Sequence, residues 1–146
     1  MGSLIINATC IGEKPDGIAV YCREIIQGIL NKNQKKHYIV YINREGIKAM
    51  SFLAQKKNVT LHIIPGWFSD DHGFIGHLLR LFFSQYLALR FPRTIIFNPS
   101  PLEMALRHRY QAVMVHDLIP LLFPKDHRRQ VLFYKYLLGS ALRCAG

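Results

Sequence analysis

The sequence predicts a Rossmann-like, doubly wound α/β domain, with a mainly parallel sheet of about five strands and helices on both faces. Short apolar runs rich in β-branched residues alternate along the chain with longer segments of helical periodicity, which is typical of βα units. In the first unit, the apolar run Leu4–Ala8 leads through a glycine-bearing loop into a helical segment at residues 18–30. The unbroken apolar character of this run favours a strand buried on both faces, as in parallel sheets.

The later elements continue this alternation. We expect further strands at residues 37–42, 59–64, 94–97 and 112–115, and further helices at residues 46–57, 74–91 and 127–144. Residues 102–110 are expected to be helical or irregular, with Arg107, His108 and Arg109 exposed. Residues 118–124 are expected to form an apolar loop, because two prolines four residues apart exclude a helix interior.

Size and composition limit the classes of protein to consider. A chain of 146 residues is enough for one domain with one core, so we take residues 1–146 as a single domain. Half of the residues are hydrophobic and 19% are charged, which excludes a disordered or fibrous chain. The net charge of +10 favours an anionic partner: nucleic acid, an acidic membrane surface or a phosphorylated small molecule.

The cysteines and the N-terminus favour a cytoplasmic protein. Cys10, Cys22 and Cys144 are an odd number and form no CxxC pair, so we expect neither a disulfide framework nor a cysteine metal site. The first apolar run has no basic segment before it, so no secretory signal is expected.

The first glycine loop, with Gly12 and Gly17, does not match the common nucleotide-binding motifs. A P-loop requires Lys-Ser/Thr after its second glycine, but Ile18 and Ala19 follow Gly17. A dinucleotide site requires an acidic residue after the second strand, where this chain has Asn43. Two interpretations stay open: amides near Gly17 bind an anion at a helix N-terminus, or the glycine only serves the turn.

The loop at residues 65–73 and the start of the next helix contain acidic residues and histidines in a spacing that matches no metal-binding pattern. These residues are Asp70, Asp71, His72 and His77. We therefore predict no metal and no cofactor, and interpret the segment as a mobile loop over a crevice.

The segment 74–91 is strongly apolar, but charged and polar residues interrupt it too often for a membrane span. His77, Arg80, Ser84 and Ala88 share one helical face, and the rest forms a wide apolar surface. That surface packs on the sheet or a neighbouring element, or it rests on a membrane or partner.

The apolar run at residues 112–115 ends abruptly in His116 and Asp117. Parallel sheets build their sites at the carboxyl ends of strands, so both residues are candidates for catalysis. His116 can donate a hydrogen bond to a hydroxyl or a phosphate oxygen, and Asp117 can accept from hydroxyls or orient His116. The alternatives are a core histidine bonded to the backbone and an aspartate that caps a loop.

Three segments resemble one family. Residues 116–121 (HDLIPL), with Phe123-Pro124 and a helix ending in residues 141–143, resemble the N-terminal domain of GT-B glycosyltransferases of the group 1 (family 4) type. Residues 15–21 are similar to that family's first glycine loop, although Asp16 and Ala19 replace its Thr and its second Gly. Residues 97–100 are similar to the loop after its fourth strand.

This resemblance implies half of a two-domain enzyme that transfers a sugar with retention, as in polysaccharide biosynthesis. The chain would be the acceptor-side half, inactive alone, and the C-terminal donor-binding domain is absent from it. The implied partners are a nucleotide-sugar donor and a glycan or lipid-linked acceptor, at a cytoplasmic location or peripheral to the inner face of the membrane. The implied site comprises His116 and Asp117 as catalytic residues and Gly12, Gly17, Asn98 and Ser100 as substrate-binding residues.

A non-catalytic basic α/β module that binds nucleic acid or an anionic membrane is the alternative. Its support is the net charge of +10. The basic residues are scattered over separate loops and no nucleic-acid motif is present, so nucleic acid is the less favoured partner.

Overall fold

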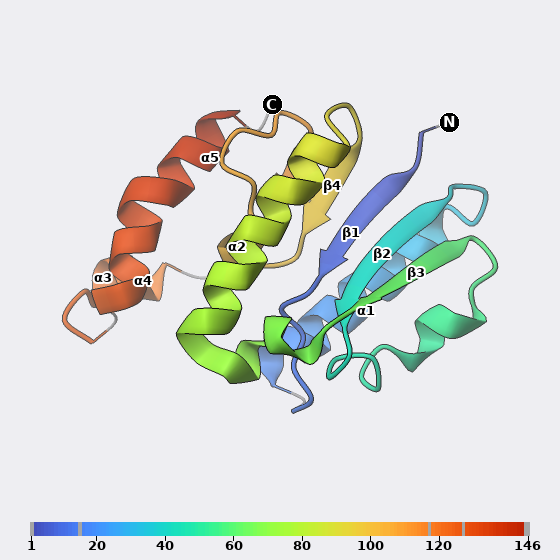
Figure 1. Cartoon of the computed structure of the whole chain (residues 1–146), viewed down its shortest axis with the longest axis horizontal. Coiled ribbons are helices and arrows are strands. Elements are labelled where there is room, and N and C mark those ends of the chain that lie inside the picture. Colours follow the sequence, from blue (N-terminus) through green and yellow to red (C-terminus); the bar gives the residue numbers. More distant parts are fainter. Residues whose placement is uncertain (1, 15, 117, 127, 145–146) are drawn as a thin grey trace.

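The structure, a computed structural model, describes residues 2–14, 16–116, 118–126 and 128–144. Within these residues, five strands form one all-parallel sheet in the order β3-β2-β1-β4-β5 (Figure 1). The strands are β1 (Leu4–Ala8), β2 (Tyr38–Asn43), β3 (Val59–Ile64), β4 (Ile95–Asn98) and β5 (Gln111–Val113). The chain winds outward from β1 first in one direction and then in the other, so the predicted doubly wound α/β fold is confirmed.

The helical elements fall into three groups. The α-helices are α1 (Gly17–Lys32), α2 (Gly73–Arg90), α3 (Ile119–Leu122), α4 (Arg128–Phe133) and α5 (Gly139–Cys144). Short 3-10 turns are η1 (Ser51–Gln55), η2 (Gly66–Phe68), η3 (Asp70–His72) and η4 (Pro101–Glu103). A π-helical turn, η5 (Tyr134–Leu138), joins α4 to α5.

Helices α1 and α2 cover opposite faces of the sheet. Successive strand residues point to opposite faces, and β1 shows this directly. Ile6 lies in one core cluster with Ile26 of α1, whereas Ile5 clusters with Leu87 of α2. In Figure 1, α2 crosses in front of the sheet and α1 lies behind it. The prediction of helices on both faces is therefore confirmed.

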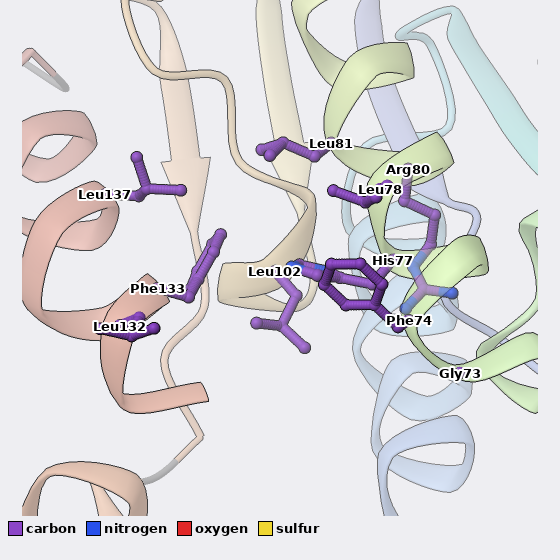
Figure 2. Close-up of a pocket in the computed structure, with 10 residues that line it drawn as sticks. All are labelled: Gly73, Phe74, His77, Leu78, Arg80, Leu81, Leu102, Leu132, Phe133 and Leu137. Atoms are coloured by element: carbon purple, nitrogen blue, oxygen red, sulfur yellow. The ribbon is translucent and has the colours of Figure 1, made fainter. Parts of the chain in front are cut away.

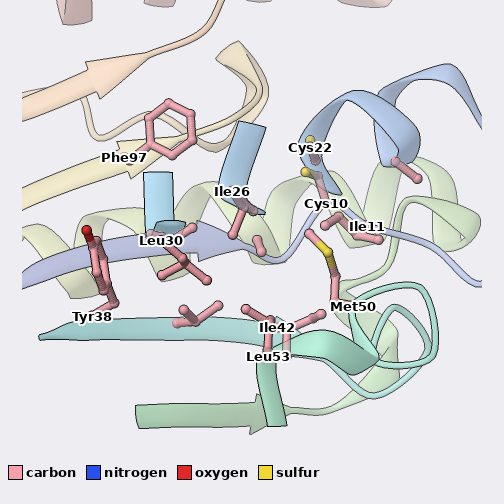
Figure 3. Packing of buried hydrophobic residues seen from close by; sticks show 14 residues of the cluster. Cys10, Ile11, Cys22, Ile26, Leu30, Tyr38, Ile42, Met50, Leu53 and Phe97 are labelled. Atoms are coloured by element: carbon pink, nitrogen blue, oxygen red, sulfur yellow. The ribbon is translucent and has the colours of Figure 1, made fainter. Parts of the chain in front are cut away.

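The predicted helix at residues 46–57 is wrong. The segment forms turns and η1, and its backbone bonds span three residues, as from Leu53 N to Met50 O (3.0 Å). Met50 and Leu53 are both buried in the α1-side core, as Figure 3 shows. Because these two buried side chains are three residues apart, they fall on the same side of a 3-10 helix, which has three residues per turn.

Two further predictions about residues 102–124 are wrong. His108 is buried rather than exposed, because its Nε2 pairs with the Thr94 carbonyl at 3.0 Å. The expected loop at residues 118–124 contains α3, where Pro120 stands in the first turn. A proline is tolerated there because the first N–H groups of a helix have no intrahelical partner.

Two polar residues of α2 are buried, while part of its apolar surface is exposed. Arg80 and Ser84 point into the protein, whereas Phe82 is 69% and Leu89 is 82% exposed. No helix in the described part of the chain is both long and apolar enough to cross a membrane. This orientation needs a buried partner for Arg80, because an isolated charge in a protein interior is very costly.

Glu103 of η4 is that partner. Arg80 Nε lies 2.8 Å from Glu103 Oε1, with both side chains buried, and Arg80 Nη1 donates to the Phe68 carbonyl at 2.8 Å. Ser84 Oγ bonds the Glu103 carbonyl, and Asn7 Nδ2 donates to Ser84 Oγ at 3.1 Å. A buried polar network thus ties α2 and η4 to β1.

We predict that Glu103→Gln lowers the free energy of unfolding by about 3 kcal/mol, because it leaves the Arg80 charge buried without its counter-charge. Urea denaturation followed by circular dichroism measures this loss. The control is Glu24→Gln, which breaks the exposed pair of Glu24 with Arg23 and should cost less than about 0.5 kcal/mol. Equal losses in the two variants would contradict the role given to the buried pair.

Candidate functional site

The strongest candidate site lies at the carboxyl ends of β4 and β5. The two strands are held together beyond their ends by a bond from Met114 N to Asn98 O (3.0 Å). His116 follows β5, and its Nε2 lies 2.7 Å from the Pro99 carbonyl oxygen. Its half-buried ring meets the ring of Tyr21, from the first turns of α1, edge to face at 4.7 Å. Three separate segments therefore fix the His116 ring.

The Pro99 contact decides where His116 carries its proton. A carbonyl oxygen can only accept, so Nε2 of His116 is the donor and Nδ1 of the neutral ring keeps a lone pair. No other hydrogen bond to His116 involves the described residues. The neutral ring can therefore accept a hydrogen bond from a substrate hydroxyl at Nδ1, and it donates from Nδ1 only as an imidazolium. Asp117, the predicted catalytic partner, lies outside the described residues.

Asn98 and Ser100, predicted to bind substrate, lie beside Pro99. The Asn98 side chain accepts from Asn7 Nδ2 (3.1 Å) and donates to Gln111 Oε1 (3.3 Å). Ser100 Oγ accepts from Leu102 N (3.2 Å) and caps η4. Both side chains are buried and hold the loop around Pro99 in place. Their contact with substrate stays a prediction.

Gly17 is the first residue of α1, at the same edge of the sheet. A Cβ there would meet no atom within 4 Å, so packing does not demand a glycine. Asp16 caps the helix, with Oδ1 accepting from Ala19 N at 2.7 Å. This carboxylate uses an amide that a bound anion would need, so an anion at this helix end would compete with Asp16.

The close approach of Asp71 explains why position 12 is a glycine. A Cβ at this position would lie 2.6 Å from Asp71 Oδ2. The same oxygen accepts from Glu13 N at 3.1 Å and from Ser69 Oγ at 2.8 Å. The hydrogen bond from Ser69, and then that from Glu13, hold the pKa of Asp71 below its ordinary value. Gly12 thus lets the first loop close against the loop after β3.

Three of the residues considered as metal ligands contact separate partners, and the side chain of Asp70 lies outside the described part of the structure. Asp71 binds the first loop, His72 Nε2 lies 3.1 Å from Glu45 Oε1, and the His77 ring packs edge-on to Phe133 at 5.2 Å. Among the described residues, no three His, Cys, Asp or Glu side chains converge.

Cys10, in the first loop, is not placed as a nucleophile. A hydrogen bond with the Cys22 side chain, together with burial, raises the pKa of the Cys10 thiol well above its ordinary value. A buried thiol of this kind stays protonated at neutral pH, whereas nucleophilic cysteines need the thiolate.

Tyr21 and the Pro99 carbonyl were not predicted as parts of the site. Tyr21 entered the sequence analysis only as the last residue of the segment 15–21, without a role in the site. A backbone carbonyl leaves no sequence signal, and its direction follows only from the folded loop.

We predict that His116 is a single Nε2–H tautomer at about pH 8, where an imidazole is neutral. Long-range ¹H–¹⁵N correlation spectra distinguish a protonated from an unprotonated ring nitrogen. A spectrum with the proton on Nδ1, or shared equally between both nitrogens, would show that Pro99 does not fix the ring.

The depressed pKa of Asp71 gives a second prediction. Because the folded pKa lies below the unfolded one, the ionised carboxylate adds stability above its unfolded pKa and loses this effect as the pH falls through the folded value. Asp71→Asn should therefore be less stable than the wild type near neutral pH, with a gap that closes below about pH 4. Urea denaturation of both proteins across this range measures the gap, and a gap independent of pH would show that the ionised Asp71 does not stabilise the contact between the two loops.

No protein-family model, curated protein or solved structure matches the chain. The site must therefore be interpreted from its own geometry, together with the resemblance seen in the sequence.

Proposed function

We propose that the chain is the N-terminal, acceptor-side domain of a retaining GT-B glycosyltransferase. The observation that carries the proposal is His116, held by the Pro99 carbonyl at the carboxyl edge of a doubly wound sheet, with Nδ1 left to meet a ligand. Sites of α/β sheets lie at this edge, and a fixed imidazole is a common partner of hydroxyl and phosphate groups. The choice of family rests on the resemblance of the HDLIPL segment, which contains His116.

In this function, the acceptor binds at the edge and a C-terminal domain holds most of the nucleotide-sugar donor. The bond between the anomeric carbon and the donor phosphate oxygen breaks with its electron pair on the phosphate, a bond to the acceptor oxygen forms, and the proton of the acceptor hydroxyl passes to the departing phosphate. His116 Nδ1 accepts a hydrogen bond from a sugar hydroxyl when neutral, or stabilises the departing phosphate as an imidazolium. The acceptor is a glycan or a lipid-linked sugar, at the cytoplasmic side of a membrane in polysaccharide biosynthesis.

The alternative is a basic module that rests on an anionic membrane without catalysis. The exposed apolar residues of α2, among them Phe82 and Leu89, favour this alternative together with the net charge of +10. It gives no reason for the fixed His116 ring, so we rank it second.

The proposal predicts that His116→Ala, in a protein that contains both domains, lowers turnover by about a hundredfold to ten-thousandfold. A coupled assay of nucleotide diphosphate release from a panel of nucleotide sugars measures turnover. The control is His62→Ala, which removes an exposed histidine of β3 that stacks on Tyr41, away from the candidate site.

Thermal unfolding of both variants should stay near that of the wild type. Turnover at the wild-type rate by His116→Ala would exclude the proposed role. Rapid sugar transfer by residues 1–146 alone would exclude the two-domain mechanism.

A further inference from the structure

A cavity of about 810 Å³ opens between α2 on one side and α4 with η5 on the other (Figure 2). Phe74, Leu78 and Leu81 of α2 line one wall, and Leu102 of η4 lies between the two helical walls. The volume falls within the range of small-molecule sites. His116 is not among the residues that line the cavity, so this is a separate feature.

The opposite wall is apolar too. Leu132, Phe133 and Leu137 line it, and Phe133 is buried whereas Leu132 is 61% exposed. The exposed Phe74 and Leu132 belong to opposite walls of the cavity. Exposure of a concave apolar surface to water costs free energy, so an apolar occupant that displaces this water would stabilise the protein.

The polar groups of the cavity are already engaged inside the protein. Arg80 pairs with Glu103 at 2.8 Å and donates to the Phe68 carbonyl at 2.8 Å. The ring of His77 packs against Phe133 at 5.2 Å. A charged ligand group in the interior would have to compete with Glu103 and the Phe68 carbonyl for Arg80, so the part of a ligand that enters should be apolar.

We propose that this cavity binds one aliphatic chain of an anionic amphiphile, with the head group left at the mouth. Leucines supply half of the lining residues, which suits a flexible alkyl chain. The anionic head follows from the net charge of +10 and from Lys135, exposed three residues after Leu132. The aliphatic chain can come from a free fatty acid or from an anionic lipid in a bilayer, since both combine an alkyl chain with an anionic head group.

The test is a titration of the whole chain with a fluorescent fatty acid, 11-(dansylamino)undecanoic acid, followed by displacement with dodecanoate. We expect saturable binding at one site per chain. Leu132→Gln should weaken binding about tenfold, because it places a polar group on the cavity wall. The matched control is Leu122→Gln, since Leu122 of α3 is 71% exposed and does not line the cavity. The control should change affinity by less than about twofold.

A second variant tests occupancy directly. Leu102→Trp adds bulk inside the cavity and should also weaken binding about tenfold, with folding checked by circular dichroism. The absence of saturable binding would overturn the proposal. Equal losses in Leu132→Gln and Leu122→Gln would overturn it as well, because they indicate adsorption to exposed apolar surface in general.

Vesicles distinguish the two possible sources of the aliphatic chain. Flotation with anionic vesicles that Leu132→Gln reduces and Leu122→Gln does not would identify a bilayer lipid, whereas binding of dodecanoate without flotation would identify a free acid. Flotation retained by both variants, with no dodecanoate binding, would overturn the proposal. A wild-type dimer that Leu132→Gln dissociates would also overturn it, because a second copy would then fill the cavity. None of these results depends on sugar transfer, so this proposal and the proposed function can fail independently.

Discussion

The buried ion pair between Arg80 and Glu103 is the constraint on which the rest of the structure depends. Taking two charges out of water costs several kcal/mol per ion, and this is recovered only where geometry and further hydrogen bonds are good. The geometry is good here, and Arg80 donates a further hydrogen bond to the Phe68 carbonyl, while Ser84 bonds the backbone carbonyl of Glu103 and so helps to hold η4 in place. The pair therefore fixes one rotational position of α2 on the sheet, with Arg80 and Ser84 inward.

The same network places the candidate site. Asn98 is held by Asn7 and Gln111 at one end of a short loop, and Glu103 is held by Arg80 at the other. Pro99 follows Asn98 directly, so its carbonyl has little freedom. The fixed carbonyl then selects the Nε2–H form of His116 and leaves Nδ1 for a ligand. In this way the buried network sets the tautomer of His116 at the edge of the sheet.

The sequence predicted the strands well, because exposing five short apolar runs to water would cost free energy. Strands of a parallel sheet bury such runs on both faces. The sequence also predicted that His116 would follow a strand. The orientation of α2 could not be predicted, because Arg80 looks like a surface residue until Glu103, 23 positions later, is brought beside it. Burial of His108 likewise depends on the distant Thr94 carbonyl, and the turns of η1 depend on where Met50 and Leu53 meet the core.

The most direct test of this account is the ring tautomer of His116 in an Asn98→Ala variant, which frees one end of the loop around Pro99. Asn58→Ala is the control, because Asn58 bonds the Lys36 carbonyl in a loop that does not contain Pro99. The account predicts that His116 loses its single Nε2–H form in Asn98→Ala and keeps it in Asn58→Ala. A folded Asn98→Ala protein with the wild-type tautomer would show that the buried network does not set the chemistry of the edge.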